Sequence, residues 1–421
     1  MQTKIEFDEK LLKLADEAEQ EISDKFAEYN KLCLYNSARV LKAFQKQKLA
    51  GTDFIEVNGY GSWDEGRNKL EAIYADLFET EDAFVRPQIM SGTHALSITL
   101  FGLLNYGDTL VYISGSPYDT LQTVIGTAGD SKNSLIRKGI KYEEIDLKND
   151  DFDIPTIQKR LKKNNVKMVA IQRSRGYAHR ASLTITKIEK VCHAIREVDP
   201  NVIIMVDDCY GELVEKREPT AVGADLCVGS LMKNLGGGIA KTGGYIVGKK
   251  TLIEDIAEHF SAPGVGKEQG ANFNENINFF KGLYFAPHSV KSALMTMTFA
   301  SKLMEKLGFD VDPHAEDFRT DIIQTINLGS YEKMVDFHVG LQKGLPINSF
   351  VTPVPDKMPG YQHDEIMADG SFTSGSTIEL SSDGPMIEPF TAYMQGGLTY
   401  EYGKLGVMIG IQEVLKNKKN A

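Results

Sequence analysis

The chain has 421 residues, too long for one average domain and too short for three, so we expect one large unit and one smaller unit. Hydrophobic residues make up 42% of the chain and charged residues 25%, a balance that excludes a disordered protein. The formal net charge of −11 argues against nucleic acid and anionic membrane surfaces as partners.

Neither the cysteines nor the first residues indicate export. The four cysteines form no Cys-x-x-Cys pair, and Cys209 and Cys227 lie in apolar segments that suit reduced core thiols. The first twenty residues mix acids with bases and contain no apolar signal segment. No run reaches the roughly 20 apolar residues that a membrane span requires. We therefore expect a cytoplasmic protein without a membrane partner.

The predicted elements begin with a charged helical stretch from about residue 8 to 48, which we interpret as an N-terminal helical arm of residues 1–55. From residue 83 onward, short apolar runs alternate with amphipathic segments. Capping boxes predict helix starts at Thr186 and Thr251. Helix patterns cover 93–107 and 186–198, and the strand candidates are 83–89, 108–114, 167–173, 201–208, 224–230 and 243–248.

Several of these strands are apolar throughout, which predicts a mainly parallel sheet with helices on both faces. We assign this α/β sheet to a large domain of residues 56–300. A long helix pattern at 289–309 and a turn-rich remainder predict a smaller α+β domain of residues 301–421.

Ligands of an open α/β sheet bind at the carboxyl ends of its strands, and phosphates bind at helix N-termini. In "IMSGTHALS" a strand leads into Ser91, Gly92 and Thr93, and a helix follows at once. Such small and hydroxyl-bearing residues suit a phosphate, although a plain helix cap is the alternative. In "GSPYDTLQTVIG" Tyr118 follows a strand, where its ring could stack on a flat ligand or pack under a loop.

Two further strand ends carry an acid and a lysine. The strand "VIIMVDD" delivers Asp207, and "GSLMKNLGGG" places Lys233 directly after the next strand candidate, so we expect both at one sheet edge. Together with a phosphate-type helix start, they meet the needs of pyridoxal 5′-phosphate chemistry. The lysine forms a Schiff base, the carboxylate keeps the pyridine nitrogen protonated, and the helix start holds the phosphate.

Other interpretations of these segments are weaker. Lys241 follows a flexible glycine run, so Lys233 is the better positioned lysine. A Walker A loop fails on spacing, because Leu235 and Ala240 occupy the two glycine positions counted back from Lys241. A metal site would use the acidic residues at the end of the strand, but no histidine lies near them in the sequence. Its candidate ligands are Asp207, Asp208 and Glu212.

Taken together, "SGTHAL", "SPYDTL", "VDDCYGEL" and "GSLMKNLGGGIAKTGGYIVG" resemble fold-type-I pyridoxal-phosphate enzymes of the cystathionine lyase and methionine γ-lyase group. Segments 59–71, 279–290 and 393–406 bring the resemblance closer to the bacterial branch often labelled aluminium-resistance or methionine γ-lyase family proteins. It covers nearly the whole chain. It implies an aspartate-aminotransferase-like fold with a seven-stranded-type sheet, and elimination of a thiol from cystathionine, cysteine or methionine.

The resemblance also implies roles for individual residues. Lys233 resembles the Schiff-base lysine, and Asp207 resembles the partner of the pyridine nitrogen. The phosphate-binding hydroxyl and loop are matched by Ser230 and by Ser91, Gly92 and Thr93.

Three aromatic or basic residues complete the resemblance. Tyr118 matches the aromatic residue that stacks on the cofactor ring. Tyr60 and Arg67 resemble a tyrosine and an arginine that reach the phosphate of a neighbouring subunit. This implies a homo-oligomer, usually a tetramer, in which subunits share active sites.

The sequence departs from the group in one respect. These enzymes hold the substrate carboxylate with an arginine of the C-terminal domain, because a guanidinium donates two hydrogen bonds to it. Here the last arginine is Arg319, so Arg173, Arg175 or Arg180 would replace it, or the substrate is not a standard amino acid. Transamination, racemisation, aldol cleavage and non-catalytic cofactor binding stay open as alternatives.

Overall fold

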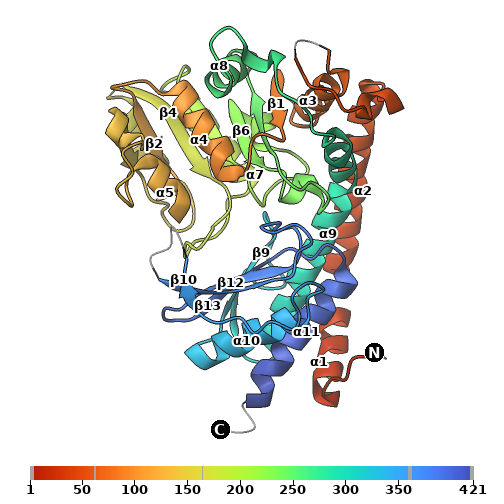
Figure 1. Cartoon of the computed structure of the whole chain (residues 1–421). Helices are drawn as coiled ribbons and strands as arrows, with labels where there is room; N and C mark the ends of the chain where they lie inside the picture. The colour runs from red at the N-terminus through yellow and green to blue at the C-terminus, as the bar shows by residue number, and fades with distance from the viewer. Residues whose placement is uncertain (1–3, 61–62, 164, 359–362, 418–421) are drawn as a thin grey trace. The chain divides into compact units, whose positions relative to one another are not determined.

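The computed structural model describes residues 4–60, 63–163, 165–358 and 363–417 (Figure 1). Backbone proximity divides the chain into two compact units: Asn36–Tyr284, and Met1–Tyr35 together with Phe285–Ala421. The domain division expected at residues 55 and 300 stays a prediction.

The Asn36–Tyr284 unit is built on a seven-stranded sheet in the order β1-β7-β6-β5-β4-β2-β3. β7 runs antiparallel to both of its neighbours, and all other pairs are parallel. This confirms the predicted mainly parallel α/β sheet. The strands are β1 (Asp82–Arg86), β2 (Thr109–Tyr112), β3 (Lys141–Glu144), β4 (Val166–Gln172), β5 (Ile203–Asp207), β6 (Leu226–Ser230) and β7 (Gly244–Gly248).

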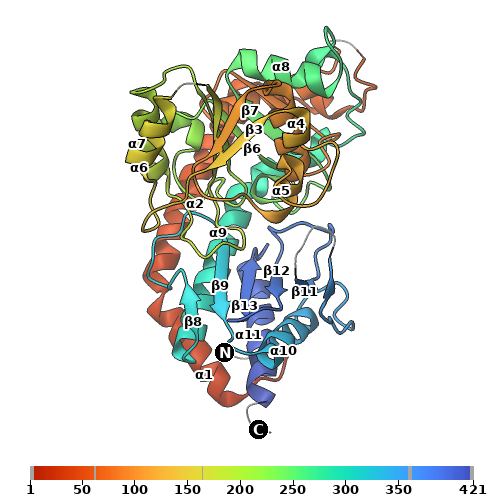
Figure 2. The ribbon, with the colours of Figure 1, turned by 90° about the vertical axis from the view of Figure 1, so that its left-hand side faces the viewer.

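Helices cover both faces of this sheet, which explains why its central strands are apolar throughout. Side chains of α4, α5 and α8 form one hydrophobic core with the sheet, and those of α6 and α7 form another. Figure 2 shows α4 and α5 on one side of the sheet and α6 and α7 on the other. These helices are α4 (Gly92–Leu103), α5 (Asp119–Ile125), α6 (Ile154–Leu161), α7 (Ile185–Arg196) and α8 (Lys250–Phe260); α3 (Glu65–Leu77) packs beside β1.

Both predicted capping boxes are wrong. The N-cap of α7 is Thr184, whose hydroxyl accepts the N–H of Lys187. Starting the helix there brings the apolar Ile185 into its first turn and buries it. α8 begins at Lys250 without a side-chain N-cap of its own, and the N–H of Lys250 donates instead to Glu81 at 2.9 Å. A partner distant in sequence therefore replaces the expected local cap.

The second unit contains a six-stranded antiparallel sheet in the order β10-β11-β12-β13-β9-β8, with α10 and α11 beneath it in Figure 1. One hydrophobic core joins this sheet to its helices. The elements are α1 (Glu9–Glu21), β8 (Asp310–Asp312), β9 (Ile323–Asn327), α10 (Tyr331–Lys343), β10 (Asp356–Lys357), β11 (Asp364–Asp369), β12 (Ser381–Pro385), β13 (Thr391–Gln395) and α11 (Tyr400–Asn417).

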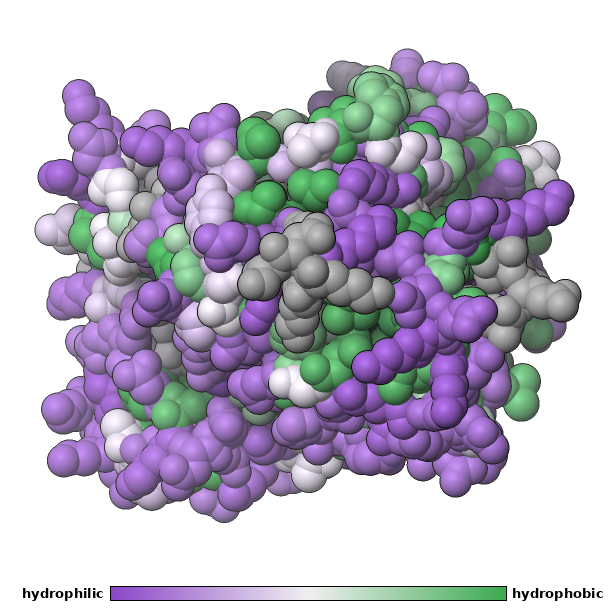
Figure 3. Space-filling model, turned by 90° about the horizontal axis from the view of Figure 1, so that it is seen from below, coloured by the Kyte–Doolittle hydropathy of each residue, from purple (hydrophilic) through white to green (hydrophobic). Residues whose placement is uncertain are grey.

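Two long helices contribute residues to both units: α2 (Ser23–Lys46) and α9 (Asn276–Lys306). α9 begins well before the predicted start at residue 289 and includes Pro287, which the sequence pattern suggested would lie outside the helix. No helix in the described ranges combines the length and apolar character needed to cross a membrane. The face seen in Figure 3 is largely hydrophilic, with hydrophobic residues in scattered groups.

Candidate active site

The carboxyl ends of the parallel strands bring the candidate residues to one edge of the large sheet. Asp207 is the last residue of β5 and lies directly opposite Gln172, the last residue of β4. Ser230 ends β6, and Lys233 follows three residues later. The sequence predicted this meeting of acid and lysine, and the strand order of the structure produces it.

Lys233 lies over an aromatic ring. Its Nζ is 3.9 Å from the centroid of the Tyr210 ring, an attraction between a cation and the ring face. Burial alone would lower the pKa of Lys233, but Cys209, Tyr210 and Asp207 hold that pKa well above its usual value. Lys241, the alternative lysine, is exposed to solvent.

Asp207 is buried, and one of its carboxylate oxygens accepts the backbone N–H of Cys209 at 3.2 Å. Burial raises the pKa of Asp207, and the charge of Lys233 opposes that increase. No ion pair within 4 Å joins the two side chains among the described residues. The acid and the amine therefore influence each other's pKa without forming a direct ion pair.

The start of α4 lies beside the end of β6. A Cβ built on Gly92 would lie 3.4 Å from both Cys209 Sγ and Ser230 Cβ. Ser91 caps the helix by accepting the N–H of His94 at 3.1 Å. The first free N–H groups of α4 and the nearby hydroxyls of Ser91, Thr93 and Ser230 form a donor set that suits an anion such as phosphate.

Tyr118 is held in place at both ends. Its backbone N–H donates to Gln172 Oε1 at 2.9 Å, and its hydroxyl shares a 2.9 Å hydrogen bond with Thr93. Tyr118 is therefore fixed between the start of α4 and the end of β4, which itself lies beside Asp207. The structure thus brings together Tyr118 and the predicted phosphate loop.

Sequence reasoning missed two residues of this site. Tyr210 contacts Lys233 and adopts a left-handed backbone conformation, with φ of 73°, which is unusual for an aromatic residue and is found at functional sites. Gln172 fixes the backbone of Tyr118. The available signals were a tyrosine three residues after the strand-end acid, and a polar residue closing an apolar strand.

Of the three arginines expected near the substrate, two have structural roles. Arg173 is fully buried and pairs with Asp208 at 2.7 Å and Glu215 at 3.0 Å, so its assignment to the substrate is wrong. Arg180 donates to the backbone carbonyls of the 172–181 segment. Arg175, the third, is buried in the loop after β4.

The acidic residues considered as metal ligands have other partners. Asp208 pairs with Arg173, and Glu212 accepts the hydroxyl of Tyr245 at 2.8 Å. Within the described ranges, no three histidine, cysteine, aspartate or glutamate side chains are arranged to hold a metal ion.

Tyr60 and Arg67, both expected to reach a neighbouring subunit, differ in exposure. The Tyr60 side chain is 73% exposed, whereas Arg67 is buried and donates to the carbonyl of Gly59 at 3.3 Å. Within one chain, only Tyr60 projects into solvent.

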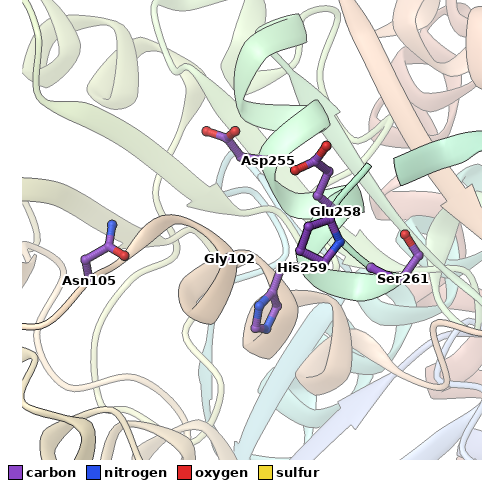
Figure 4. A pocket seen from close by; sticks show the side chains of 8 residues that line it. Gly102, Asn105, Asp255, Glu258, His259 and Ser261 are labelled. Atoms are coloured by element: carbon purple, nitrogen blue, oxygen red, sulfur yellow. The ribbon is translucent and has the colours of Figure 1, made fainter. Parts of the chain in front are cut away.

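A separate hollow of about 530 Å³ lies at the opposite end of α4, next to α8 (Figure 4). Asp255, Glu258 and His259 of α8 line it, together with Asn105. Because Gly102 marks this end of α4 and Ser91 caps the other, the hollow is distinct from the strand-end site.

The sheet and its strand-end residues define the fold of pyridoxal-phosphate enzymes of fold type I. A distant solved structure with this fold, the pyridoxal-5′-phosphate dependent protein YhfS from Escherichia coli, has a TM-score of 0.64 at 15% identity over 91% of this chain and 96% of that chain. The family model described as methionine gamma-lyase matches residues 11–415, and the chain therefore belongs to that family. The resemblance drawn from the sequence is confirmed.

Close relatives span nearly the whole chain. The uncharacterized protein YnbB of Bacillus subtilis is 44% identical over 97% of this chain and 98% of its own length. A solved structure from Clostridium acetobutylicum, provisionally named a cystathionine beta-lyase involved in aluminum resistance, is 44% identical with a TM-score of 0.94, covering 96% of both chains. A carbon-sulfur lyase involved in aluminum resistance from Clostridium novyi is 41% identical with a TM-score of 0.92, also covering 96% of both.

Proposed function

We propose that the protein is a pyridoxal-phosphate-dependent carbon–sulfur lyase that eliminates a thiol from a sulfur-containing amino acid, of the cystathionine, cysteine or methionine type. The observation that carries the proposal is Lys233, held over Tyr210 at the same sheet edge as the buried Asp207. Membership of the methionine gamma-lyase family and the names of the two clostridial relatives support the reaction class.

The residues present fit the cofactor. The start of α4 and the hydroxyls of Ser91, Thr93 and Ser230 would hold its phosphate, and Tyr118 would stack on its ring. Asp207 would accept a hydrogen bond from the ring nitrogen and keep it protonated. Lys233 would bind the cofactor covalently. When bound, the cofactor supplies a conjugated ring that accepts the electron pair left after a substrate Cα–H bond breaks.

Each residue has a definite task in such a reaction. Once the substrate amine has taken its place, Lys233 would accept the α-proton on Nζ. Tyr210 keeps Nζ near one position by facing it with its ring. Asp207 would keep its negative charge beside the protonated ring nitrogen, in a buried site where that charge is weakly screened.

Arg175 is the residue we assign to the substrate carboxylate. It is buried in the loop after β4, and the adjacent Gly176 places that loop beside Tyr118, whose Cβ would lie 3.8 Å from a Cβ on the glycine. A guanidinium at this place would give the fork that a carboxylate requires.

The proposal includes a homo-oligomer with shared active sites. The exposed Tyr60 would reach the phosphate site of a second copy, as the family resemblance implies. A tetramer built from such pairs is the expected assembly, in the cytoplasm and without a nucleic-acid or membrane partner.

The central test compares two lysine variants. Lys233→Ala should abolish both the yellow colour of the purified protein and the label fixed by borohydride, because Lys233 lies over Tyr210 at the ends of the parallel strands. Lys241→Ala, a matched variant of an exposed lysine in the same loop region, should keep both. Loss of colour in Lys241→Ala with retention in Lys233→Ala would overturn the assignment.

Product analysis separates the alternative reactions. Elimination releases a thiol together with ammonia and a keto acid, whereas transamination, racemisation and aldol cleavage do not. A protein that binds the cofactor without catalysis would show the colour but no turnover with any thioether amino acid.

A further inference from the structure

The turn that follows β5, residues 208–214, has an unusual backbone that buried side chains hold in place. Tyr210 and Leu213 both adopt left-handed conformations, with φ of 73° and 61°, which cost free energy for residues with a Cβ. Three consecutive carbonyls of the turn accept hydrogen bonds from buried side chains: Gly211 from Arg173 at 2.9 Å, Glu212 from Asn234 at 2.9 Å, and Leu213 from Asn36 at 2.8 Å.

The middle one of these bonds connects the turn to the lysine. Asn234 directly follows Lys233 and is itself fully buried. Its amide donates to the carbonyl of Glu212, two residues after Tyr210. The turn that carries the aromatic ring and the loop that carries the amine are thus joined at Glu212.

The side chain of Glu212 is buried, and among the described residues it forms no ion pair within 4 Å. Its Oε1 accepts the hydroxyl of Tyr245 at 2.8 Å, and its Oε2 has no hydrogen-bond partner in the part of the chain that the structure describes. Glu218 is equally buried but lies 3.5 Å from Arg39 and 3.9 Å from Arg173. Of these two buried glutamates, six residues apart, Glu218 therefore lies beside arginines and Glu212 does not.

An isolated carboxylate is far more costly to bury than a neutral acid, so it binds a proton instead. Burial and the nearby Asp208 raise the pKa of Glu212 well above its usual value, while hydrogen bonds from its own backbone N–H and from the Tyr245 hydroxyl, and then the charge of Lys233, act in the opposite direction. The titratable groups around Glu212 come from its own turn, from α3, from β6 and β7, and from the lysine loop. They are Asp208, Cys209, Tyr74, Cys227, Tyr245 and Lys233.

We propose that Glu212 is a positioning residue that stays an uncharged carboxylic acid at neutral pH, joining the turn of Tyr210 to the loop of Lys233 without adding a charge beside the lysine. One strand-end acid, Asp207, then faces the reaction as an anion, and its neighbour five residues later supports the same site in neutral form. When the surroundings of two nearby acids favour different protonation states, the two acids take different roles in the site.

The test uses the full-length protein with its cofactor bound, and the variants Glu212→Gln and Glu218→Gln. At pH 8 the infrared difference between wild type and Glu212→Gln should contain the carbonyl band of a neutral carboxylic acid. The matched difference for Glu218→Gln should contain carboxylate bands, because Glu218 is paired with arginines. Carboxylate bands in the Glu212→Gln difference, or a Glu212→Gln protein that does not fold, would overturn the proposal.

A second readout follows the lysine itself. The pH midpoint of the absorbance of the lysine-bound cofactor should move by less than about 0.3 units in Glu212→Gln, whereas removing a nearby anion would lower it by about one unit or more. Glu212→Ala should weaken cofactor retention about tenfold or more, and Glu212→Gln should restore it to within about twofold. Equal losses in both variants would contradict the positioning role.

This spectral readout rests on the proposed function of Lys233, but the infrared readout does not. A protein with the acid band and no lyase activity would retain the inference and refute the function. A lyase whose Glu212 gives carboxylate bands would do the reverse.

Discussion

At the scale of single residues, the role of each arginine depends on whether its charge is paired with an acid of the protein. Arg173 is fully buried but faces Asp208 and Glu215, so its charge is neutralised within the fold. A guanidinium remains charged at all ordinary pH values, so one that meets a substrate carboxylate must lie where that carboxylate arrives. Arg175 follows β4 at the sheet edge where Asp207 ends its strand, which is why we assign it to that task.

The assignment predicts a selective loss of substrate affinity. Arg175→Ala should raise KM for the amino-acid substrate about tenfold to a hundredfold, because charge-assisted hydrogen bonds contribute about 1.5–3 kcal/mol. The absorbance of the lysine-bound cofactor should stay as in wild type. Steady-state kinetics with the amino acid and with the matching amine that lacks the carboxylate measure the effect. If both substrates are affected equally, Arg175 does not bind the carboxylate.

The sequence placed Asp207 and Lys233 at one sheet edge, because a strand followed at once by a charged residue indicates such an edge. The strand order agrees with that position, and the roles of the two residues stay predictions. Arg173 was kept among the three candidate arginines because its partner Asp208 lies 35 residues further along the chain, and no local pattern shows such a pairing. Tyr210 was missed because its importance lies in a backbone conformation and a contact with Lys233 that only the folded chain provides.

At the scale of elements, the pattern of apolar strands identified six of the seven strands of the large sheet, and the exception is instructive. β3 has the sequence Lys-Tyr-Glu-Glu and lies at the edge of the sheet next to β2. The side chains of an edge strand are only partly covered, so they can be charged. β3 therefore lacks the apolar pattern of the central strands. The helix caps failed for a related reason, since Glu81 supplies the cap of α8 from a distant segment.

A histidine of α10 that contacts β12 makes the stability of the second unit depend on pH. His338 is fully buried, with Nδ1 2.8 Å from the carbonyl oxygen of Met334 and Nε2 3.1 Å from the hydroxyl of Ser382. Burial lowers the pKa of His338 to about 4. In the unfolded chain the His338 imidazole binds a proton near pH 6.5, whereas in the folded chain it does so only near pH 4. The free energy of unfolding therefore decreases as pH falls from about 6.5 to about 4.

The expected loss over that interval is about 3.5 kcal/mol, at about 1.4 kcal/mol for each unit of pKa difference. His338→Gln should lower stability at pH 7.5 but flatten the fall in thermal midpoint between pH 7 and pH 4.5. His314→Gln, at a histidine whose side chain is 61% exposed, is the matched control and should leave the wild-type slope. If the slope of His338→Gln equals that of wild type, another group controls this pH dependence.

At the scale of the whole molecule, the resemblance extended over nearly the full chain because its motifs lie on different strands and loops that meet only after folding. Each motif alone has a common structural explanation, such as a helix cap or a packed tyrosine. Their joint occurrence in the right order is rare, and the family match over residues 11–415 agrees with it. The boundaries at 55 and 300 were less accessible to such reasoning, because α2 and α9 each contribute to both compact units.

The oligomer is the part of the proposal that one chain cannot complete, and Tyr60 provides a way to test it. If Tyr60 acts at the site of a second copy, Tyr60→Ala and Lys233→Ala inactivate different components of each shared site. Each protein alone should be nearly inactive. After the two are mixed, unfolded and refolded together, half of the pairs contain one of each, and each such pair has one site with both residues intact.

The mixture should therefore regain about one quarter of wild-type activity, because one site in four is intact when subunits pair at random. A mixture of Tyr60→Ala with wild type, prepared in the same way, controls for losses during refolding. If Tyr60 acts within its own chain, one subunit of each mixed pair lacks the lysine and the other lacks the tyrosine, so no intact site forms and activity stays at the level of the separate variants. The exposure of Tyr60 in the single chain, against the burial of Arg67, makes the tyrosine the informative choice for this experiment.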